Sequence, residues 1–470
     1  MATSTTTGQG SMEMARAAEA LHNSLRGDFI QAGDPGYEDA RKLYNGMIDK
    51  RPFVIAQCAD VADVIAAVTF AREQGLPLAI RGGGHNGPGF GSVDDGVVVD
   101  LSHMRWVRVE PADGTVRVGG GCLWRDVDHG TQPFGLSVPC GIVSSTGVGG
   151  LTLGGGIGYL ARKYGLTIDS LLGVDMVLAD GSVVTANAGQ NPDLFWAVRG
   201  GGGNFGVVTS FLFQGRPVQQ VYGGPMMWPL EQGADVLRDW QKLILEAPDE
   251  VNGWFGYVTV PPGPPFPAEW HMKKMAVIVW SCTGDMAAGE AALKPIRQKM
   301  PPAIDFAGPI PMPALNSMFD ALFPPGLQWY WRANFFTRYS DDMIALHQQY
   351  AEHLPTMQST MHIYPINGAA GRVAVADTAF AYRTANFAQV IVGVDPDPAN
   401  NDRMIRWARE YSDALHPYSA GGAYVNMMMD EGEDRVRNAY GPNHARLAAI
   451  KARHDPHNLF RVNQNIRPSA

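Results

Sequence analysis

Glycine is concentrated in four clusters in the first half of the chain, and this pattern constrains the fold more than any other feature. The chain has 55 glycines among 470 residues, and the clusters occupy 82–91, 119–121, 147–158 and 200–206. Glycine adopts backbone conformations that other residues avoid, and it lets backbone N–H groups approach a ligand closely. The clusters therefore indicate built loops of the kind that surround phosphate groups.

Two residues with nucleophilic side chains accompany these loops. His85 lies inside the first cluster, and Cys140 lies shortly before the third. Neither of these two loops is a Rossmann fingerprint with an acidic residue about 20 positions on, and neither is a P-loop ending in Gly-Lys-Ser/Thr. Imidazole and thiolate are suited to add to an electrophilic carbon of a flavin ring. The pair predicts a covalently held nucleotide cofactor, although a turn histidine and a buried thiol remain the alternatives.

The length of the chain exceeds what one hydrophobic core usually supports, so we expect two domains. A strand at 53–57, a helix capped by Asp60 and a strand at 76–80 form a βαβ unit that leads into the first glycine loop. From 47 to 217 the sequence indicates strands and glycine loops with few helices. After this point aromatic strands alternate with amphipathic helices, which is typical of an antiparallel sheet covered by helices. The expected fold class is α+β.

The division of the chain follows from this change of character. The expected strands of the second half occupy 254–260, 275–280, 328–336, 361–366 and 387–394. The expected helices occupy 283–298, 341–353, 400–414 and 444–453. We therefore expect an N-terminal segment, a cofactor domain, a substrate domain and a C-terminal segment returning to the cofactor domain, at 1–46, 47–217, 218–415 and 416–470.

Composition excludes several classes of partner. A net charge of −9 gives no electrostatic attraction for nucleic acid or an anionic membrane. No run reaches the roughly 18 apolar residues of a membrane span, and residues 1–12 lack the order of a secretory signal. The four cysteines form neither a zinc pattern nor a disulfide framework. We expect a soluble, cytoplasmic protein without a metal, either a monomer or a homodimer.

A series of motifs occurs in order from about residue 47 onward. They are Arg81-Gly-Gly-Gly-His85-Asn86, Pro139-Cys140-Gly141, Gly147-Val-Gly-Gly-Leu-Thr152, Arg162-Lys163-Tyr164-Gly165-Leu166, Asn204-Phe205, Tyr424-Val-Asn426, Asp455-Pro456 and Asn463-Gln464. This series resembles the berberine bridge enzyme-like FAD-linked oxidases of the vanillyl-alcohol oxidase superfamily. The resemblance implies a PCMH-type FAD-binding domain, and FAD bound bicovalently through His85 at the 8α-methyl carbon and Cys140 at C6.

The resemblance also implies which further residues hold the cofactor. In the first loop they are Arg81, Gly82, Gly83, Gly84, Asn86 and Gly87. Around the third cluster they are Ser144, Ser145, Thr146, Gly147, Gly149, Gly150, Gly155 and Tyr159. Later in the chain they are Gly206, Val207, Tyr424, Asn426, Asn463 and Gln464. Two covalent bonds would fix the ring and raise its redox potential.

Roles in the reaction are expected for five residues. Tyr424 resembles a general base of the family, and its pKa would have to fall below the usual value of about 10 for this role. Tyr364, Tyr382 and Arg383 are candidates for the neighbour that lowers this pKa or for substrate contact, with core packing as the alternative for each tyrosine. Thr152 resembles a gate beside flavin C4a, where a small residue admits dioxygen.

The implied reaction is a two-electron oxidation. A base removes a proton from O–H or N–H, hydride passes from the adjacent carbon to flavin N5, and O2 reoxidises the flavin to give H2O2. The run Met427-Met-Met429 would form a flexible apolar wall, so we expect a bulky organic substrate such as a secondary metabolite, oxidised at an alcohol or a ring C–H or C–N group. A carbohydrate oxidase, a flavin dehydrogenase with another acceptor and a non-catalytic flavin-binding protein are the alternatives, and aromatic residues at 254–257 and 329–331 offer stacking surfaces for either substrate class.

Overall fold

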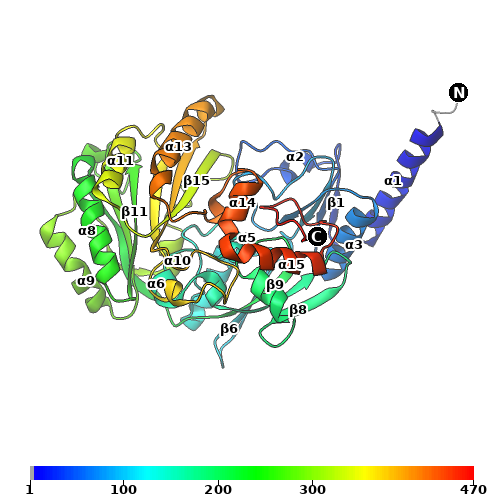
Figure 1. Cartoon of the computed structure of the whole chain (residues 1–470), viewed down its shortest axis with the longest axis horizontal. Coiled ribbons are helices and arrows are strands. Elements are labelled where there is room, and N and C mark those ends of the chain that lie inside the picture. The colour runs from blue at the N-terminus through cyan, green and yellow to red at the C-terminus, as the bar shows by residue number, and fades with distance from the viewer. Residues whose placement is uncertain (1–4, 470) are drawn as a thin grey trace.

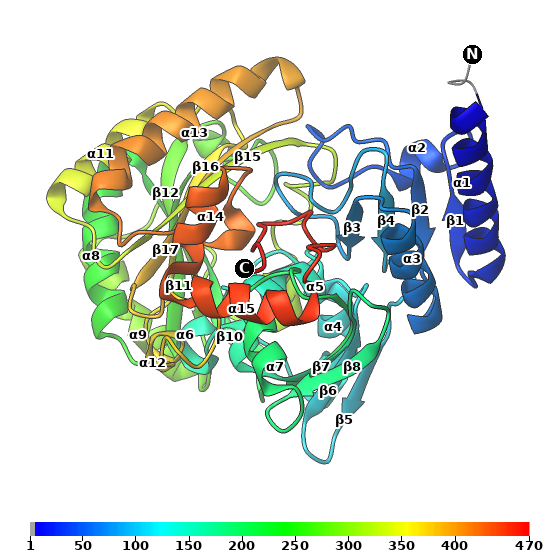
Figure 2. The ribbon, with the colours of Figure 1, turned by 45° about the vertical axis from the view of Figure 1, so that its right-hand side comes forward.

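Residues 5–469 are described by the computed structural model, in which three β-sheets build two halves of the molecule (Figure 1). One half contains a four-stranded and a five-stranded sheet, and the other contains an eight-stranded sheet. The C-terminal segment runs back between the halves, so that both ends of the chain contribute to the first half (Figure 2). Mixed helix and sheet content with antiparallel sheets confirms the α+β class.

The four-stranded sheet contains the predicted βαβ unit. Its order is β1-β2-β4-β3, in which β2, β4 and β3 are parallel and β1 is antiparallel. Helix α3 (Val61–Glu73) begins where the Asp60 carboxylate accepts hydrogen bonds from the N–H groups of Ala62 and Asp63. Helix α1 (Thr5–Ser24) packs against α3. The strands are β1 (Asp28–Ile30), β2 (Val54–Gln57), β3 (Leu78–Arg81) and β4 (Val97–Asp100).

The five-stranded sheet is antiparallel, with the order β5-β6-β9-β7-β8. Its strands are β5 (Val107–Glu110), β6 (Thr115–Gly119), β7 (Leu171–Val177), β8 (Val183–Asn187) and β9 (Val207–Gln214). This part of the chain holds more helix than the sequence predicted, namely α4 (Trp124–Thr131), α5 (Val148–Gly154), α6 (Ala161–Tyr164) and α7 (Pro192–Val198). Three of the seven residues of α5 are glycine, a poor helix former, so burial of Val148 and Leu153 supports it instead of propensity.

The eight-stranded sheet is antiparallel throughout. Its order is β13-β10-β12-β11-β16-β17-β15, with β14 paired to β10. The five predicted strands are present as β11 (Val251–Thr259), β12 (Lys274–Cys282), β15 (Gln328–Phe336), β16 (Thr360–Pro365) and β17 (Phe387–Asp395). The additional strands are β10 (Gln220–Pro229), β13 (Ile304–Asp305) and β14 (Gly308–Pro311).

Helices cover one face of this sheet and leave the other face for the first half of the molecule (Figure 1). The covering helices are α8 (Gly233–Glu246), α9 (Met286–Lys299), α11 (Asp341–Glu352) and α13 (Asn401–Leu415). Side chains alternate along β16, because Met361 and Ile363 join the core beneath the helices whereas Tyr364 joins the core on the opposite face. Shorter helices occur at α2 (Tyr37–Ala40), α10 (Met312–Asn316) and α12 (Ala369–Arg372).

A buried ammonium group fixes the C-terminal segment. Beyond α14 (Glu433–Tyr440), helix α15 (His444–His454) carries Lys451, whose Nζ donates to Asp455 Oδ2 at 2.6 Å and to the carbonyl oxygens of Asn204 and Phe460. A buried charge is tolerated when it is paired and fully hydrogen-bonded, as it is here. The contact with Asn204 ties the tail to the fourth glycine cluster. Among residues 5–469, no helix combines the length and apolarity that crossing a bilayer requires.

Candidate active site

A cavity lies between the two halves. The first glycine loop, α5 and the fourth glycine cluster line one side, and strands β11, β15, β16 and β17 line the other. Residues from 424 to 427 and from 462 to 464 complete the wall. Ligand pockets commonly form at such junctions. The cavity is therefore the candidate active site.

The first glycine loop presents a row of free backbone donors to this cavity. The N–H groups of residues 82–87 donate to no backbone or side-chain acceptor within the described residues 5–469. Gly82, Gly83 and Gly84 line the cavity. Backbone N–H groups are obligatory donors, so such a row requires a ligand or solvent. A pyrophosphate, with its many acceptor oxygens, fits these donors.

The backbones of two glycine loops touch at the cavity wall. A Cβ added to Gly83 would lie 2.4 Å from the nitrogen of Gly147, and a Cβ added to Gly147 would lie 2.3 Å from the nitrogen of Gly83. Both distances are below any real Cβ contact, so neither position accepts a side chain. The glycines therefore bring two loops together into one cradle, which a nucleotide cofactor would fill.

His85 is held in this cradle by two contacts. Its ring stacks on Tyr44 with centroids 3.7 Å apart, and Ser145 Oγ lies 3.2 Å from Nε2. Nδ1 has no hydrogen-bond partner in the part of the chain that the structure describes. Burial lowers the pKa of His85 to about 3, an effect that the contact with Ser145 partly opposes. The imidazole is therefore neutral near pH 7, which is the form that acts as a nucleophile.

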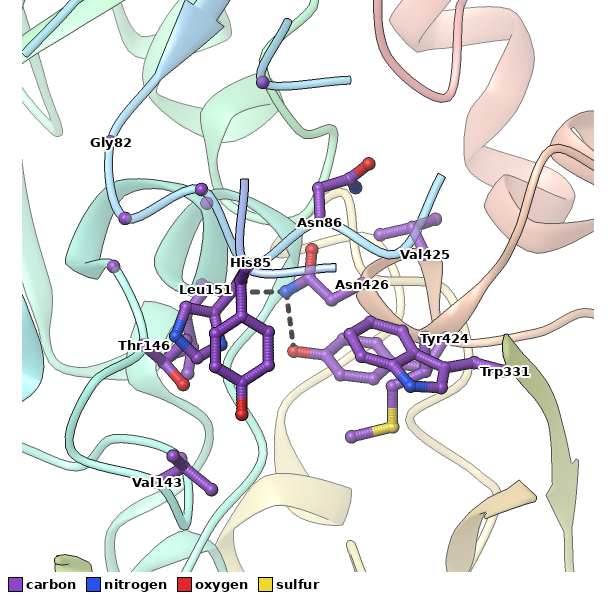
Figure 3. Close-up of a pocket in the computed structure, with 18 of the residues that line it drawn as sticks. Gly82, His85, Asn86, Val143, Thr146, Leu151, Trp331, Tyr424, Val425 and Asn426 are labelled. Atoms are coloured by element: carbon purple, nitrogen blue, oxygen red, sulfur yellow. Dashed lines mark hydrogen bonds between the residues drawn. The ribbon is translucent and has the colours of Figure 1, made fainter. Parts of the chain in front are cut away.

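Cys140 lies outside the cavity wall, contrary to the role predicted for it. Its side chain is buried, and Asn316 Nδ2 lies 3.4 Å from Sγ. Burial and the neighbouring Asp128 raise the pKa of the thiol well above its usual value. The cavity is lined instead by the three residues that follow, of which Val143 lies near His85 and Thr146 in Figure 3. The position and protonation of Cys140 therefore argue against a bond from this residue to a ring in the cavity.

Tyr424 and Asn426 form a hydrogen-bonded pair at the opposite wall (Figure 3). The oxygen of Tyr424 accepts from the Gly156 N–H at 2.8 Å and from Asn426 Nδ2 at 2.9 Å, and Asn426 Nδ2 also donates to Leu151 O. Burial raises the pKa of Tyr424 to about 12 despite these two donors. The phenol therefore stays protonated at neutral pH, which contradicts the lowered pKa that a general base requires. Since both acceptor positions of its oxygen are used, its own proton is free to be donated to a ligand.

Two other predicted side chains do not line the cavity. Thr152 is fully buried, and the cavity is lined by its neighbours Leu151 and Leu153. The hydroxyl of Tyr382 donates to Asn438 O, outside the cavity. These positions argue against a gate at Thr152 and a catalytic role for Tyr382, because neither side chain can contact a ligand bound there.

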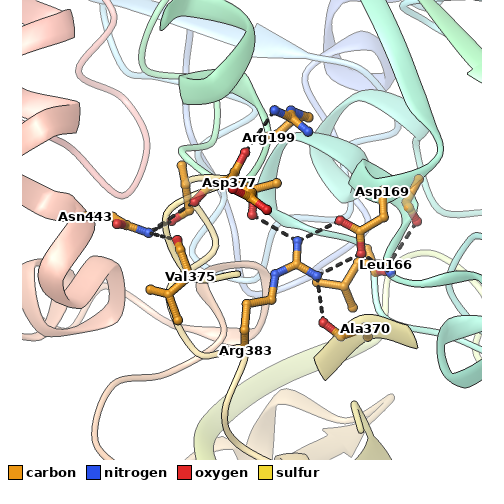
Figure 4. A network of polar contacts seen from close by, with 12 residues as sticks. Leu166, Asp169, Arg199, Ala370, Val375, Asp377, Arg383 and Asn443 are labelled. Carbon is orange, nitrogen blue, oxygen red and sulfur yellow. Dashed lines mark hydrogen bonds and ion pairs between the residues drawn. The ribbon is translucent and has the colours of Figure 1, made fainter. Parts of the chain in front are cut away.

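Arg383 has a structural role. Both terminal nitrogens donate to the carboxylate of Asp169, at 2.8 and 2.7 Å, and further bonds go to Ala370 O and Thr378 Oγ1 (Figure 4). All of these partners are within the protein, and both ends of the ion pair are buried. Arg383 therefore ties the substrate half to the first half and does not contact substrate.

The remaining predicted site residues divide into two groups. Those that line the cavity are Arg81, Gly82, Gly83, Gly84, His85, Asn86, Thr146, Gly147, Gly149, Gly150, Gly206, Tyr364, Tyr424, Asn426, Asn463 and Gln464. Those that lie behind the wall are Gly87, Ser144, Ser145, Gly155, Tyr159 and Val207. Ser145 still acts on the site through His85, and Ser144 hydrogen-bonds Asp320.

The sequence did not indicate two of the most informative cavity residues. Tyr44 lies in the N-terminal segment, where nothing in the local pattern suggests contact with a loop 40 positions later. His362 lies on β16 between Thr360 and Tyr364, and its signal was available, because polar residues at every second position of a strand share one face. Only Met427 of the predicted methionine wall lines the cavity; Met428 is in the protein core.

Comparisons with known proteins agree with this geometry. A family model described as FAD binding domain matches residues 52–187, and one described as Berberine and berberine like matches residues 423–467. The chain is 31% identical over 451 residues to the uncharacterized FAD-linked oxidoreductase YgaK of Bacillus subtilis, covering 94% of this chain and 97% of the relative. It is 28% identical over 480 residues to the chitooligosaccharide oxidase of Gibberella zeae, covering 93% of this chain and 92% of the relative. The crystal structure of 6-hydroxy-D-nicotine oxidase from Arthrobacter nicotinovorans matches with a TM-score of 0.85 at 25% identity, covering 95% of this chain and 99% of that chain.

Proposed function

We propose, from the premise that this chain belongs to the berberine-like FAD-linked oxidoreductases, that it is an oxidase that uses dioxygen to oxidise a small organic molecule in the cavity described above. The observation that carries the proposal is the position of His85, a neutral nucleophile between two glycine loops with free backbone donors. These groups fit FAD, because the backbone donors of the first glycine loop would hold its pyrophosphate and His85 would bond to its ring.

We further propose that FAD is attached through His85 alone. Nδ1 of His85 is the nitrogen without a protein partner, since Nε2 is taken by Ser145. The buried, protonated thiol of Cys140 supports one covalent bond in place of the two predicted from the sequence.

Different residues of the chain have different roles in the site. Residues 82–87 bind the phosphates through their N–H groups, and Asn463 and Gln464 close the cavity from the C-terminal segment. Bound FAD supplies the acceptor for the two electrons that leave the substrate. Tyr424 donates its proton in a hydrogen bond to a substrate oxygen or nitrogen, and thereby orients the bond that is oxidised. The substrate half excludes water by its aromatic and aliphatic walls.

The substrate is a bulky organic molecule oxidised at an alcohol or a ring C–N group. The names of the relatives include a hydroxynicotine oxidase and a chitooligosaccharide oxidase, so both an aromatic heterocycle and a sugar are named as substrates among these relatives. For this chain the apolar lining of the substrate half favours the first kind.

Two measurements on the purified protein test the proposal. After denaturation in acid, the yellow colour should stay with the polypeptide, and the intact mass should exceed that of the chain by one FAD. In the absence of oxygen a true donor should bleach the flavin absorbance, and air should restore it with release of hydrogen peroxide. A colourless chain of unmodified mass contradicts the attachment, and a flavin that reoxidises only with another acceptor contradicts the oxidase.

A further inference from the structure

The substrate half of the cavity has apolar walls. The ring-bearing residues that form them are Trp254, Phe319, Phe323, Trp329 and Trp331. The indole N–H groups of the three tryptophans are buried and have no partner within residues 5–469, so these residues present carbon to the cavity. Flat rings of this kind stack on planar ligands.

No charged side chain faces this half of the cavity in the described part of the chain. The one arginine of the lining, Arg81, belongs to the first glycine loop, and its Nη2 is paired with Asp100 at 2.7 Å. No lysine, aspartate or glutamate lines the cavity among residues 5–469. A charged ligand would therefore be buried there without a counter-ion, which is costly.

One hydrogen-bonded pair interrupts these walls. His362 and Tyr364 project from the same face of β16, and Nδ1 of His362 lies 2.7 Å from the Tyr364 hydroxyl. The Trp254 ring lies 4.4 Å from the His362 ring. This packing depends on Gly256, because a Cβ there would lie 3.1 Å from His362 and 3.2 Å from Trp254.

The pair has hydrogen-bonding capacity that the protein does not use. Nε2 of His362 has no partner among residues 5–469 and is open to the cavity. By contrast, the hydroxyl of Thr360 on the same strand donates to Tyr257 O, so it is not available. Burial lowers the pKa of His362 to about 3, and burial with the neighbouring Tyr159 and Tyr424 raises the pKa of Tyr364 well above its usual value. The neutral pair has three polar atoms, namely the two ring nitrogens of His362 and the hydroxyl oxygen of Tyr364, and it carries two protons on them. It can therefore donate a hydrogen bond to a hydroxyl group or accept one from it.

We propose that the His362–Tyr364 pair is the polar anchor of the substrate pocket, and that the pocket selects an uncharged, flat ring system carrying a hydroxyl group. The inference rests on the proposed function, since it concerns the substrate of the same site. The ring stacks among the tryptophans, and its hydroxyl replaces the missing partner of the pair. An oligosaccharide fits poorly, because most of its hydroxyls would be buried without partners at about 1–3 kcal/mol each.

The test uses four probes on the flavin-loaded protein: 2-naphthol, naphthalene, 2-naphthoate and diacetylchitobiose. Binding is followed by the change in flavin absorbance and in tryptophan fluorescence, so it requires no turnover. We expect 2-naphthol to bind about tenfold more tightly than naphthalene and at least about tenfold more tightly than 2-naphthoate. The disaccharide should give no saturable signal.

Two variants test whether the His362–Tyr364 pair causes the preference for 2-naphthol over naphthalene. His362→Phe keeps an aromatic ring beside Trp254, and Tyr364→Phe removes one hydroxyl; each should reduce the affinity for 2-naphthol to that for naphthalene. His353→Phe, the same change at an exposed histidine on the far side of the sheet, should retain the wild-type preference.

Three results would each overturn the proposal of a polar anchor. They are equal binding of naphthol and naphthalene, tighter binding of naphthoate or the disaccharide than of naphthol, and no binding of any probe. The wild-type comparison alone can do this, so the outcome does not depend on the variants folding. A purified protein without flavin would instead contradict the proposed function, and the absorbance spectrum of the same sample separates the two failures.

Discussion

Tyr44 stacks on His85 with ring centroids 3.7 Å apart and an angle of 15° between the planes. The Tyr44 hydroxyl donates to Phe323 O at 2.7 Å, so one residue joins the N-terminal segment, the first glycine loop and the substrate half. A stacked ring restricts the orientation of the imidazole. The stacking therefore prepares His85 for attack on the cofactor.

We expect Tyr44→Ala to slow covalent attachment of FAD at least about tenfold, because the imidazole loses its stacking partner. Tyr44→Phe keeps the ring and should attach FAD at nearly the wild-type rate. The measurement is the fraction of chains carrying FAD, by intact mass, at intervals after FAD is added to cofactor-free protein. Equal rates in all three proteins would show that the stacking has no part in attachment.

The two predicted attachment residues should behave differently. His85→Ala should release all of its colour on acid denaturation, whereas Cys140→Ser should keep one covalently bound FAD per chain, because Sγ lies behind the cavity wall beside Asn316. The intact masses of the two variants distinguish them directly. If FAD were released more easily from the Cys140→Ser protein, this result would show that Cys140 forms a second bond to the cofactor.

Tyr424→Phe should lower kcat/KM by about tenfold to a hundredfold, the cost of one lost hydrogen bond to the substrate. The pKa of Tyr424 is about 12, so ionisation of this phenol should not affect the rate between pH 6 and 10. We therefore expect the wild type and the variant to have pH profiles of the same shape over this range. A pH profile with the donor that releases peroxide fastest is the measurement. An ascending limb near neutral pH that Tyr424→Phe abolishes would identify Tyr424 as a base after all.

Buried neutral histidines should make the fold sensitive to acid. His347 is fully buried on α11, hydrogen-bonded to Tyr411, and burial lowers its pKa from 6.5 to about 3. Between pH 3 and pH 6.5 the unfolded chain therefore binds one more proton at His347 than the folded chain does. The contribution of this histidine to the free energy of unfolding is fully present above pH 6.5 and is lost as the pH falls. By pH 5 this histidine alone should cost about 2 kcal/mol.

The check is the fall in Tm between pH 7 and pH 5. His347→Gln should reduce this fall relative to the wild type, and His353→Gln, at the exposed C-cap of the same helix, should leave it unchanged. The expectation fails if the buried and exposed variants show the same pH dependence.

Asp169→Asn should destabilise the protein by about 3 kcal/mol or more, because it leaves the buried guanidinium of Arg383 without its counter-charge. Asp193→Asn breaks exposed ion pairs with Arg446 and Arg453 and should cost less than about 1 kcal/mol. Thermal unfolding of the two variants measures the contrast. Similar Tm values would mean that the pair does not hold the halves together.

The sequence predicted most of the strands, because alternating aromatic and β-branched residues mark a half-buried sheet. It missed α8, although Val236, Trp240 and Ile244 lie on one buried face at helical spacing. It also missed α5, whose glycines disfavour a helix that only tertiary packing stabilises.

Prediction of the site succeeded where the backbone itself forms it. The first glycine loop lines the cavity. Its place in a ligand site could be predicted, because its lack of side chains is visible in the sequence. For Cys140 the bond stays a prediction, since residue type reveals a nucleophile but not the direction in which Sγ points. The pKa of Tyr424 was equally out of reach, because it depends on burial by elements far away in the chain.

The cavity draws on parts of the chain that are synthesised at very different times. The first glycine loop emerges early, whereas Asn463 and Gln464 follow Lys451, whose contact with Asn204 docks the tail. A nascent chain on the ribosome can thus fold its first sheets while the nucleotide site still lacks a wall. The cavity has all of its walls only when this late segment has been translated and has docked.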